Sequence, residues 1–269
     1  MFKLHLYWFS LNRKDNKENY GDVLGPFIVS KLSKRKIVSI PYLNSRKYNF
    51  LYKQYFTIGS IIKRVTKNSI VWGSGIINAD EQVKKATFLA VRGPRTRNRL
   101  LDLGYSVPEK YGDPALLLPK FISNTKNKKY ILGIIPHIVD YKELKETFQH
   151  DDTVRIINLI TDDVERTTNE ILECEHIISS SLHGVIVSHA YNIPALWVKF
   201  SNKLSGDNVK FYDYFESVGI DYNKELSVNL KETNTEELLH LLIENKKNSL
   251  PKSNLLNLRL KQLLETCPF

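Results

Sequence analysis

The stretch Ser179-Ser-Ser-Leu-His-Gly-Val-Ile-Val-Ser-His-Ala-Tyr-Asn-Ile-Pro194 puts a histidine between the end of one predicted strand and the start of one predicted helix. The run 175–179 is short and rich in isoleucine, which is typical of a buried parallel strand. Residues 184–191 have helical spacing with small residues on one side. We therefore expect His183 at the carboxyl end of a strand, facing a crevice. The helix start beside it would offer free N–H groups to a phosphate or carboxylate.

The same alternation of strand and helix extends to both sides of this stretch. Predicted strands fall at 3–9, 36–40, 55–58, 69–72, 86–91, 130–135, 154–159 and 195–200, and predicted helices at 21–33, 95–103, 141–148, 163–174, 235–245 and 254–265. A polar, basic segment at 124–129 divides the two series. The pattern predicts an α/β protein with two Rossmann-like, doubly wound domains facing each other across a cleft. We place them at 1–123 and 124–269, the second ending in the closing helices.

Composition narrows the choice of partners. The 269 residues carry a formal net charge of +10, and the sequence pI is about 9.3, which implies attraction to anions. Candidates are a small phosphorylated substrate, a lipid diphosphate and a membrane surface. Nucleic acid is disfavoured, because the basic residues are scattered and no nucleic-acid motif accompanies them. With no apolar run near the roughly 18 residues that cross a bilayer, we expect a cytoplasmic protein, with peripheral contact at the inner membrane face as an option.

The two cysteines, Cys174 and Cys267, lie far apart in sequence, which fits a reducing compartment. His137, His150 and His176 have no companions at metal-ligand spacing, so we predict no metal site. For His189, six residues after His183, a packing or surface role is expected.

Short polar motifs follow several of the predicted strands. Asn19-Tyr-Gly-Asp22 opens the first predicted helix, where Asn19 is either a plain N-cap or, with Asp22, a contact for an acceptor hydroxyl. Ile58-Gly-Ser60 and Trp72-Gly-Ser-Gly75 hold glycines that would let backbone approach a ligand closely. Neither matches a dinucleotide fingerprint or a Walker loop.

Charged side chains follow other strands in the same way. Arg92 and Arg95 lie between a strand end and a helix start, where a guanidinium fork suits carboxylate or phosphate, although a surface role is equally expected. Asp113 is interpreted as a turn cap. Lys199, Lys203 and the block 209–214 follow the His183 helix and its next strand, and their lysines can converge on one anion.

Five of these motifs occur in the order found in the polysaccharide pyruvyl transferase family, which the chain resembles from about Tyr7 to Ile220. They are Asn19-Tyr-Gly-Asp22, Trp72-Gly-Ser-Gly75, Val91-Arg-Gly-Pro-Arg-Thr96, Gly112-Asp-Pro-Ala-Leu-Leu-Leu-Pro119 and Ser181-Leu-His-Gly-Val185. Lys210-Phe-Tyr-Asp213-Tyr resembles the Lys-Trp-x-Asp-Trp pattern of the branch that acts on bacterial exopolysaccharides. Phe211 and Tyr214 stand where that pattern has tryptophan.

The resemblance implies a GT-B-like arrangement, with phosphoenolpyruvate as donor and a sugar diol as acceptor. The product would be a pyruvate ketal on a surface polysaccharide, such as an exopolysaccharide or capsule, or on its lipid diphosphate-linked precursor. Neither a cofactor nor a metal is implied. The family pattern places essential residues at Arg92, on the acceptor-side N-terminal domain, and at His183, on the donor-side C-terminal domain.

The remaining site residues follow from the same resemblance. Catalysis is assigned to His183 and Arg92, with His183 as the proton carrier because imidazole exchanges protons near neutral pH. The expected donor-binding residues are Arg92, Ser181, Gly184, Lys203 and Lys210, and the expected acceptor-binding residues are Asn19, Asp22, Gly73 and Ser74. Lys203 best matches the family's donor-binding lysine, with Lys199 and Lys210 as alternatives.

Two other functions remain open at this point. A glycosyltransferase that uses a nucleotide sugar can share the same architecture, because fold does not fix function. A non-catalytic glycan-binding module is the third possibility. The lack of a clear ribose-binding acid beside a glycine fingerprint favours pyruvyl transfer.

Overall fold

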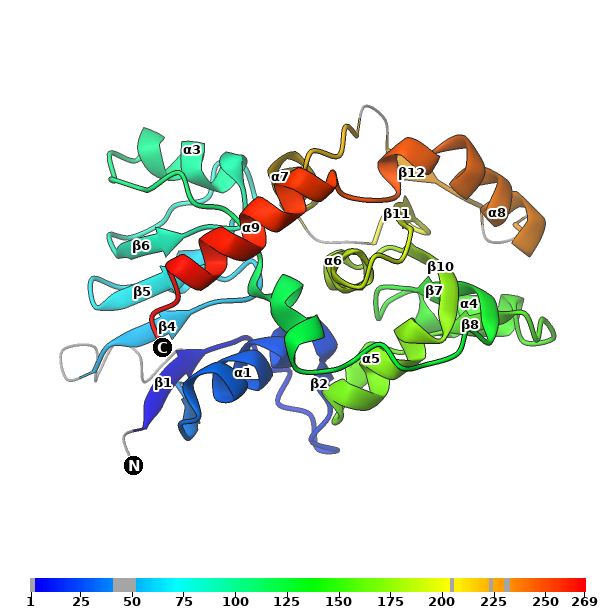
Figure 1. The fold of residues 1–269 in the computed structure, drawn as a ribbon, viewed down its shortest axis with the longest axis horizontal. Helices are drawn as coiled ribbons and strands as arrows, with labels where there is room; N and C mark the ends of the chain where they lie inside the picture. The colour runs from blue at the N-terminus through cyan, green and yellow to red at the C-terminus, as the bar shows by residue number, and fades with distance from the viewer. Residues whose placement is uncertain (1–2, 41–51, 204–205, 223–224, 230–232) are drawn as a thin grey trace.

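The computed structural model describes residues 3–40, 52–203, 206–222, 225–229 and 233–269 as a mixed α/β protein with two parallel sheets flanked by helices (Figure 1). Each sheet has five strands, in the order β3-β1-β4-β5-β6 and β12-β11-β10-β7-β8. The predicted α/β class and its parallel sheets are therefore confirmed. The domain boundary at 123/124 stays a prediction.

The first sheet is built from the N-terminal half of the chain. Its strands are β1 (Leu4–Tyr7), β3 (Ile37–Ser39), β4 (Gln54–Phe56), β5 (Ser69–Trp72) and β6 (Thr87–Ala90). Helices α1 (Tyr20–Ser33) and α3 (Pro94–Asp102) follow β1 and β6. The 3-10 helices η1 (Ile62–Arg64) and η2 (Pro114–Lys120) complete this half.

The second sheet places β10 (Cys174–Ser179) at its centre, paired with β7 (Tyr130–Ile135) and β11 (Ala195–Lys199). The outer strands are β8 (Val154–Ile156) and β12 (Leu226–Ser227). Its helices are α4 (Tyr141–Thr147), α5 (Val164–Leu172), α6 (Leu182–Ala190), α7 (Val209–Val218) and α8 (Thr235–Glu244), followed by the 3-10 helix η3 (Lys246–Asn248). The strand–histidine–helix order predicted around His183 is confirmed.

The strand expected at 154–159 differs from the structure. β8 ends at Ile156, and a separate short strand, β9 (Ile160–Thr161), pairs antiparallel with β2 (Glu18–Asn19) of the first half. The side chain of Asn158 accepts a hydrogen bond from the backbone N–H of Ile160 and so turns the chain between them. The predicted strand therefore runs past the end of β8, and β9 follows it as a separate strand in a different sheet.

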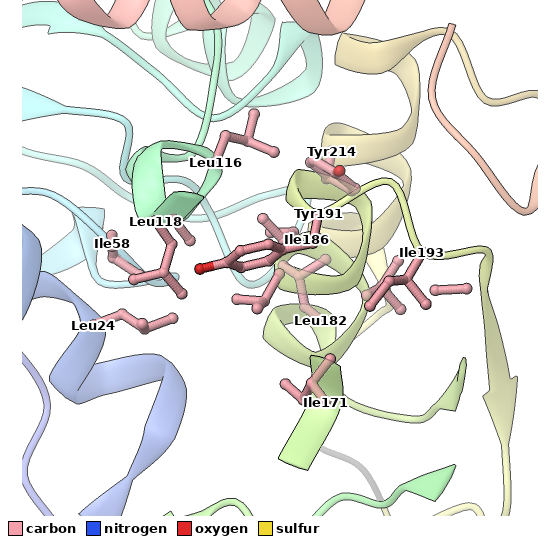
Figure 2. Packing of buried hydrophobic residues seen from close by; sticks show 14 of the residues in the cluster. Leu24, Ile58, Leu116, Leu118, Ile171, Leu182, Ile186, Tyr191, Ile193 and Tyr214 are labelled. Carbon is pink, nitrogen blue, oxygen red and sulfur yellow. The ribbon is translucent and has the colours of Figure 1, made fainter. Parts of the chain in front are cut away.

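One large apolar cluster runs between the two halves. Leu24 of α1 and Ile58 of the first half belong to the same buried cluster as Leu118 of η2 and Leu182 and Ile186 of α6. Figure 2 shows Leu118 and the ring of Tyr191 filling the space between α1 and α6. Burial of this much apolar surface fixes the position of the two sheets relative to each other.

The last helix, α9 (Ser253–Glu265), crosses back to the first sheet (Figure 1). The indole N–H of Trp72 donates to the carbonyl of Leu263 at 3.0 Å, and Lys110 pairs with Glu265 at 3.0 Å. Phe269 packs edge-on against Trp72. A segment that belongs to the second half in sequence thus packs on the first half in space.

Among the residues described here, no helix is both long enough and apolar enough to span a membrane.

Candidate active site

A pocket of about 450 Å³ is lined by residues from both halves of the chain. Its lining residues are Tyr7, Phe9, Leu11, Asn19, Asp22, Gly59, Ser60, Ile61, Lys63, Arg64, Ile77, His137, Ile138, Ser181, Leu182, His183 and Lys210. Five of the sequence-predicted site residues meet here: Asn19, Asp22, Ser181, His183 and Lys210. This is the expected location, because ligands of open α/β sheets bind beyond the carboxyl ends of the strands.

Helix α6 begins in this pocket without a side-chain cap. Its first internal hydrogen bond runs from the N–H of Val185 to the carbonyl of Ser181, so the N–H groups of residues 182–184 precede the helical ladder. The Ser179 hydroxyl holds the N–H of Ser181 and thereby fixes the turn from β10 into the helix. The positive end of α6 can therefore receive an anion.

The imidazole of His183 lies between a buried carboxylate and the start of α1. Its Nε2 is 3.6 Å from Oδ2 of Asp113, and both atoms are buried without a hydrogen-bond partner among the described residues. The other carboxylate oxygen of Asp113 accepts from the N–H of Ala115 at 2.9 Å, which confirms the predicted turn cap and anchors the carboxylate. On the Nδ1 side, a Cβ added to Gly21 would lie 2.1 Å from the ring, so only glycine leaves room for the imidazole.

Helix α1 also begins at the pocket. The side chain of Asn19 accepts from the N–H of Gly21 at 3.0 Å, which confirms its predicted N-cap role. Asp22 lies in the first turn and lines the pocket. Burial raises the pKa of its carboxyl to about 7, while His183 and Lys210 act to lower that pKa and Glu18 to raise it. Asp22 can therefore hold or release a proton near neutral pH.

Of the three candidate lysines, Lys210 is the one that lines the pocket. It is the second residue of α7, and burial lowers its pKa to about 8, with a further decrease from Arg92 and an opposing effect of Asp22. Lys199 pairs with Glu225 at 2.5 Å, and Lys203 is exposed.

Arg92 lies behind the pocket wall and is fully buried. Its Nε donates to Asp213 at 3.0 Å, one terminal nitrogen donates to the hydroxyl of Ser60 at 2.8 Å, and the other donates to the carbonyl of Ile76 at 2.7 Å. Ser60 itself lines the pocket. The guanidinium thus reaches the pocket through the Ser60 hydroxyl.

The predicted glycines and Ser74 shape the backbone around the pocket. Gly73 has a φ of +91°, and a Cβ there would lie 2.2 Å from Pro114. The Ser74 hydroxyl donates to the carbonyl of Gly59, a pocket residue. At Gly184 a Cβ would meet the Ser179 hydroxyl oxygen at 2.4 Å, so glycine lets α6 pack tightly on the strand ends.

His137 is a pocket residue that the sequence reasoning did not select. It follows β7 directly, so the strand-end rule that identified His183 applies to it equally. Burial lowers the pKa of His137, Lys210 lowers it further, and Asp140 raises it. Lys63 and Arg64 of η1 also line the pocket, and Lys63 lies 3.6 Å from Glu81.

The aromatic residues that replace the expected tryptophans are packed inside the protein. Phe211 is fully buried and stacks on Trp197 with ring centroids 4.2 Å apart. The hydroxyl of Tyr214 lies 3.0 Å from Nδ1 of His189, which confirms a packing role for that histidine.

The pocket therefore combines an uncapped helix N-terminus, an imidazole backed by a carboxylate, a half-buried lysine and a carboxyl that can exchange protons. The polysaccharide pyruvyl transferase family model matches residues 9–202, a range that contains Asn19, Arg92, Asp113 and His183. An uncharacterized protein, L143, of Acanthamoeba polyphaga mimivirus is 36% identical over 211 residues, covering 76% of this chain and 72% of that protein. The chain belongs to the polysaccharide pyruvyl transferase family.

Proposed function

We propose that the protein transfers the pyruvyl group of phosphoenolpyruvate to two hydroxyls of a sugar, forming a pyruvate ketal on a surface polysaccharide or its precursor. The observation that carries this proposal is the meeting of the uncapped start of α6, His183 and Lys210 in one pocket. Phosphoenolpyruvate carries a phosphate and a carboxylate on three carbons, so its binding site must supply several positive groups at short range.

The donor would lie against α6. The N–H groups of residues 182–184 and the hydroxyl of Ser181 suit one anionic group, and the ammonium of Lys210 suits the other. Arg92 supports this wall through Ser60. The acceptor sugar would lie on the α1 side, where Asn19 and Asp22 line the pocket.

The reaction moves two hydroxyl protons. His183 would donate a proton to C3 of the donor, turning its CH₂ into a methyl group and C2 into an oxocarbenium-like centre. The first hydroxyl then bonds to C2 and returns a proton to the imidazole. The C2–O bond to phosphate breaks, the second hydroxyl closes the ketal, and its proton leaves with the phosphate.

Asp113 and Asp22 would assist this proton transfer from two sides. Asp113 faces Nε2 of His183 and would orient the imidazole and stabilise its protonated form, as buried carboxylates do behind catalytic histidines. Asp22 would accept a hydrogen bond from an acceptor hydroxyl. The net charge of +10 supports an acceptor that carries phosphate, such as a sugar on a lipid diphosphate at the inner membrane face.

Calorimetric titration with phosphoenolpyruvate and with a panel of nucleotide sugars tests the donor. We expect phosphoenolpyruvate to bind, and Lys210→Met to weaken binding by about 10- to 100-fold, the usual effect of losing a charged hydrogen bond. The matched control is Lys203→Met, which removes an exposed lysine from the same region and should change the affinity less than twofold. Binding of nucleotide sugars alone would instead support glycosyl transfer.

Turnover is tested by phosphate release from phosphoenolpyruvate in the presence of sugar acceptors, with NMR detection of the new ketal methyl group. His183→Asn should keep donor binding and lose at least about 100-fold in rate, the usual contribution of a proton carrier. A His183→Asn variant that releases phosphate at the wild-type rate would remove His183 from the mechanism. Donor binding without turnover on any acceptor would favour a binding module.

A further inference from the structure

The contacts of Arg92 leave little of its guanidinium for a ligand. Its side chain is 0% exposed, and all three of its nitrogens donate to protein oxygens, on Asp213, Ser60 and Ile76. Because the side chain has no exposed surface, a direct contact with a donor anion would require Arg92 to move away from these partners, and separating a buried ion pair is strongly destabilising.

Asp213 links this arginine to the wall of the pocket. It is fully buried in α7, one turn after Lys210. Besides Arg92, it accepts from the backbone N–H of Thr96 at 2.9 Å and from the Thr96 hydroxyl at 2.7 Å. The start of α3 and the middle of α7 are therefore tied together by one carboxylate, and the helix that carries Lys210 is held against the first half.

The backbone beside Arg92 is shaped around the same contact. A Cβ on Gly93 would lie 1.8 Å from the carbonyl oxygen of Asp213, and one on Gly75 would lie 2.5 Å from the guanidinium carbon. Both glycines thus permit the close approach of α7 and the arginine. The glycines at 75 and 93 therefore accommodate the contact between Arg92 of the first half and Asp213 of the second half.

We propose that Arg92 is a positioning residue of the donor site, which fixes Ser60 and the Lys210-bearing helix through its buried pair with Asp213 and does not itself contact the donor. This inference rests on the proposed function and refines the role that the family resemblance gives to the arginine. It explains why the pocket is lined by Ser60 and Lys210 while Arg92 lies behind them.

A coupled substitution distinguishes positioning from direct binding. Arg92→Met alone leaves Asp213 buried without its cation, and we expect phosphoenolpyruvate affinity to fall at least tenfold. Arg92→Met combined with Asp213→Leu removes both charges, leaves the net charge unchanged and replaces the pair with apolar groups. We expect the double variant to bind phosphoenolpyruvate at least fivefold more tightly than Arg92→Met alone.

The direct-binding alternative predicts no recovery of affinity in the double variant. An arginine that holds the donor is equally absent from the single and double variants, so equal affinities in the two would overturn the proposal. Circular dichroism and thermal unfolding confirm that each variant is folded. Asp213→Asn, which keeps the shape of the side chain, separates positioning from a pure charge effect. Positioning predicts weaker donor binding, because the contacts of Asp213 with Arg92 and Thr96 are weakened, whereas the loss of a negative charge alone predicts equal or tighter binding of an anion.

A measurement on the protein without phosphoenolpyruvate tests the positioning role of Arg92 independently of the proposed function. NMR titration of Lys210, identified by its loss in Lys210→Met, reports how close Arg92 lies to the ammonium. Because Arg92 lowers the pKa of Lys210, Lys210 should titrate at higher pH in Arg92→Met than in the wild type. An unchanged titration would overturn the positioning role. A shifted titration in a protein that binds no phosphoenolpyruvate would overturn the proposed function alone.

Discussion

Helices α1 and α6 both begin at the pocket, and their N-termini differ in a way that assigns the two sides. The start of α1 is capped by Asn19 and carries its own acidic residue, Asp22. The start of α6 has neither a side-chain cap nor an acidic residue in its first turn. The N-terminus of a helix attracts negative charge. At α1 the protein itself provides that charge, through Asp22, whereas at α6 the free N–H groups are available to an anionic ligand.

The difference indicates that a helix N-terminus is open to a ligand when its first turn lacks a side-chain cap and an acidic residue. His183 sits at the α6 start and packs against Gly21 of the α1 start, so the two helix ends meet at one imidazole. A donor anion on one side and an acceptor hydroxyl on the other would both be within reach of that ring. Substitutions at Gly21 and Asp22 change the α1 start, and a substitution at Ser181 changes the α6 start.

The largest effect is expected from Gly21→Ala. The new methyl group would lie 2.1 Å from Nδ1 of His183 and force the imidazole to move. A displacement of about 1 Å can cost 100-fold in rate, so we expect a loss of that order in ketal formation. The matched control is Gly25→Ala in the same helix, where the nearest atom is 3.2 Å away. A Gly21→Ala enzyme as active as this control would show that the close packing of the ring is dispensable.

An acidic residue introduced at the N-cap of α6 should make the start of this helix resemble that of α1. Ser181→Asp would cap the helix and place a carboxylate where the donor anion is proposed to bind, so phosphoenolpyruvate affinity should fall about tenfold or more. Ser181→Asn is the matched control, because it caps without charge. Titration calorimetry compares the two. If asparagine weakens binding as much as aspartate does, charge repulsion is not the cause of the loss. If neither substitution weakens binding, the anion site lies elsewhere.

The smallest effect is expected from Asp22→Asn, measured as a change in the free energy of unfolding. The carboxyl pKa of Asp22 is raised from 3.8 to about 7 in the folded protein, so its ionisation opposes folding as pH rises between about 4 and 7. The asparagine variant should therefore be more stable than the wild type at pH 8, by roughly 1–3 kcal/mol, and nearly equal to it at pH 4. Thermal unfolding at both pH values measures this. A variant less stable than the wild type at pH 8 would contradict the burial effect.

Local sequence patterns predicted most elements of the fold and one side of the pocket. The helix α6, the strand before it and the N-cap at Asn19 all follow from residues that are adjacent in the chain. His183 was placed correctly at a strand end for the same reason. His137 obeys the same rule after β7, and the sequence contained the signal needed to select it.

Contacts between distant residues could not be predicted in this way. Asp113 and His183 are brought together by η2 and α6, and Arg92 meets Asp213 across 121 residues. Neither pairing leaves a periodic pattern, because it depends on how the two sheets pack. The choice of Lys210 over Lys203 depends instead on where α7 begins: the helix follows Asn208, whose φ is 66°, and its second residue is Lys210.

The return of α9 to the first sheet has a consequence for dissecting the protein. Trp72, Lys110 and Tyr111 all bond to α9, which begins well over a hundred residues later. A fragment cut at 123 would therefore lose the carbonyl that accepts the Trp72 indole N–H and would expose a buried aromatic surface. The first sheet and α9 therefore form one structural unit that is discontinuous in sequence. A protein in which the first sheet is exchanged with that of a relative has to carry residues 253–269 of the same relative.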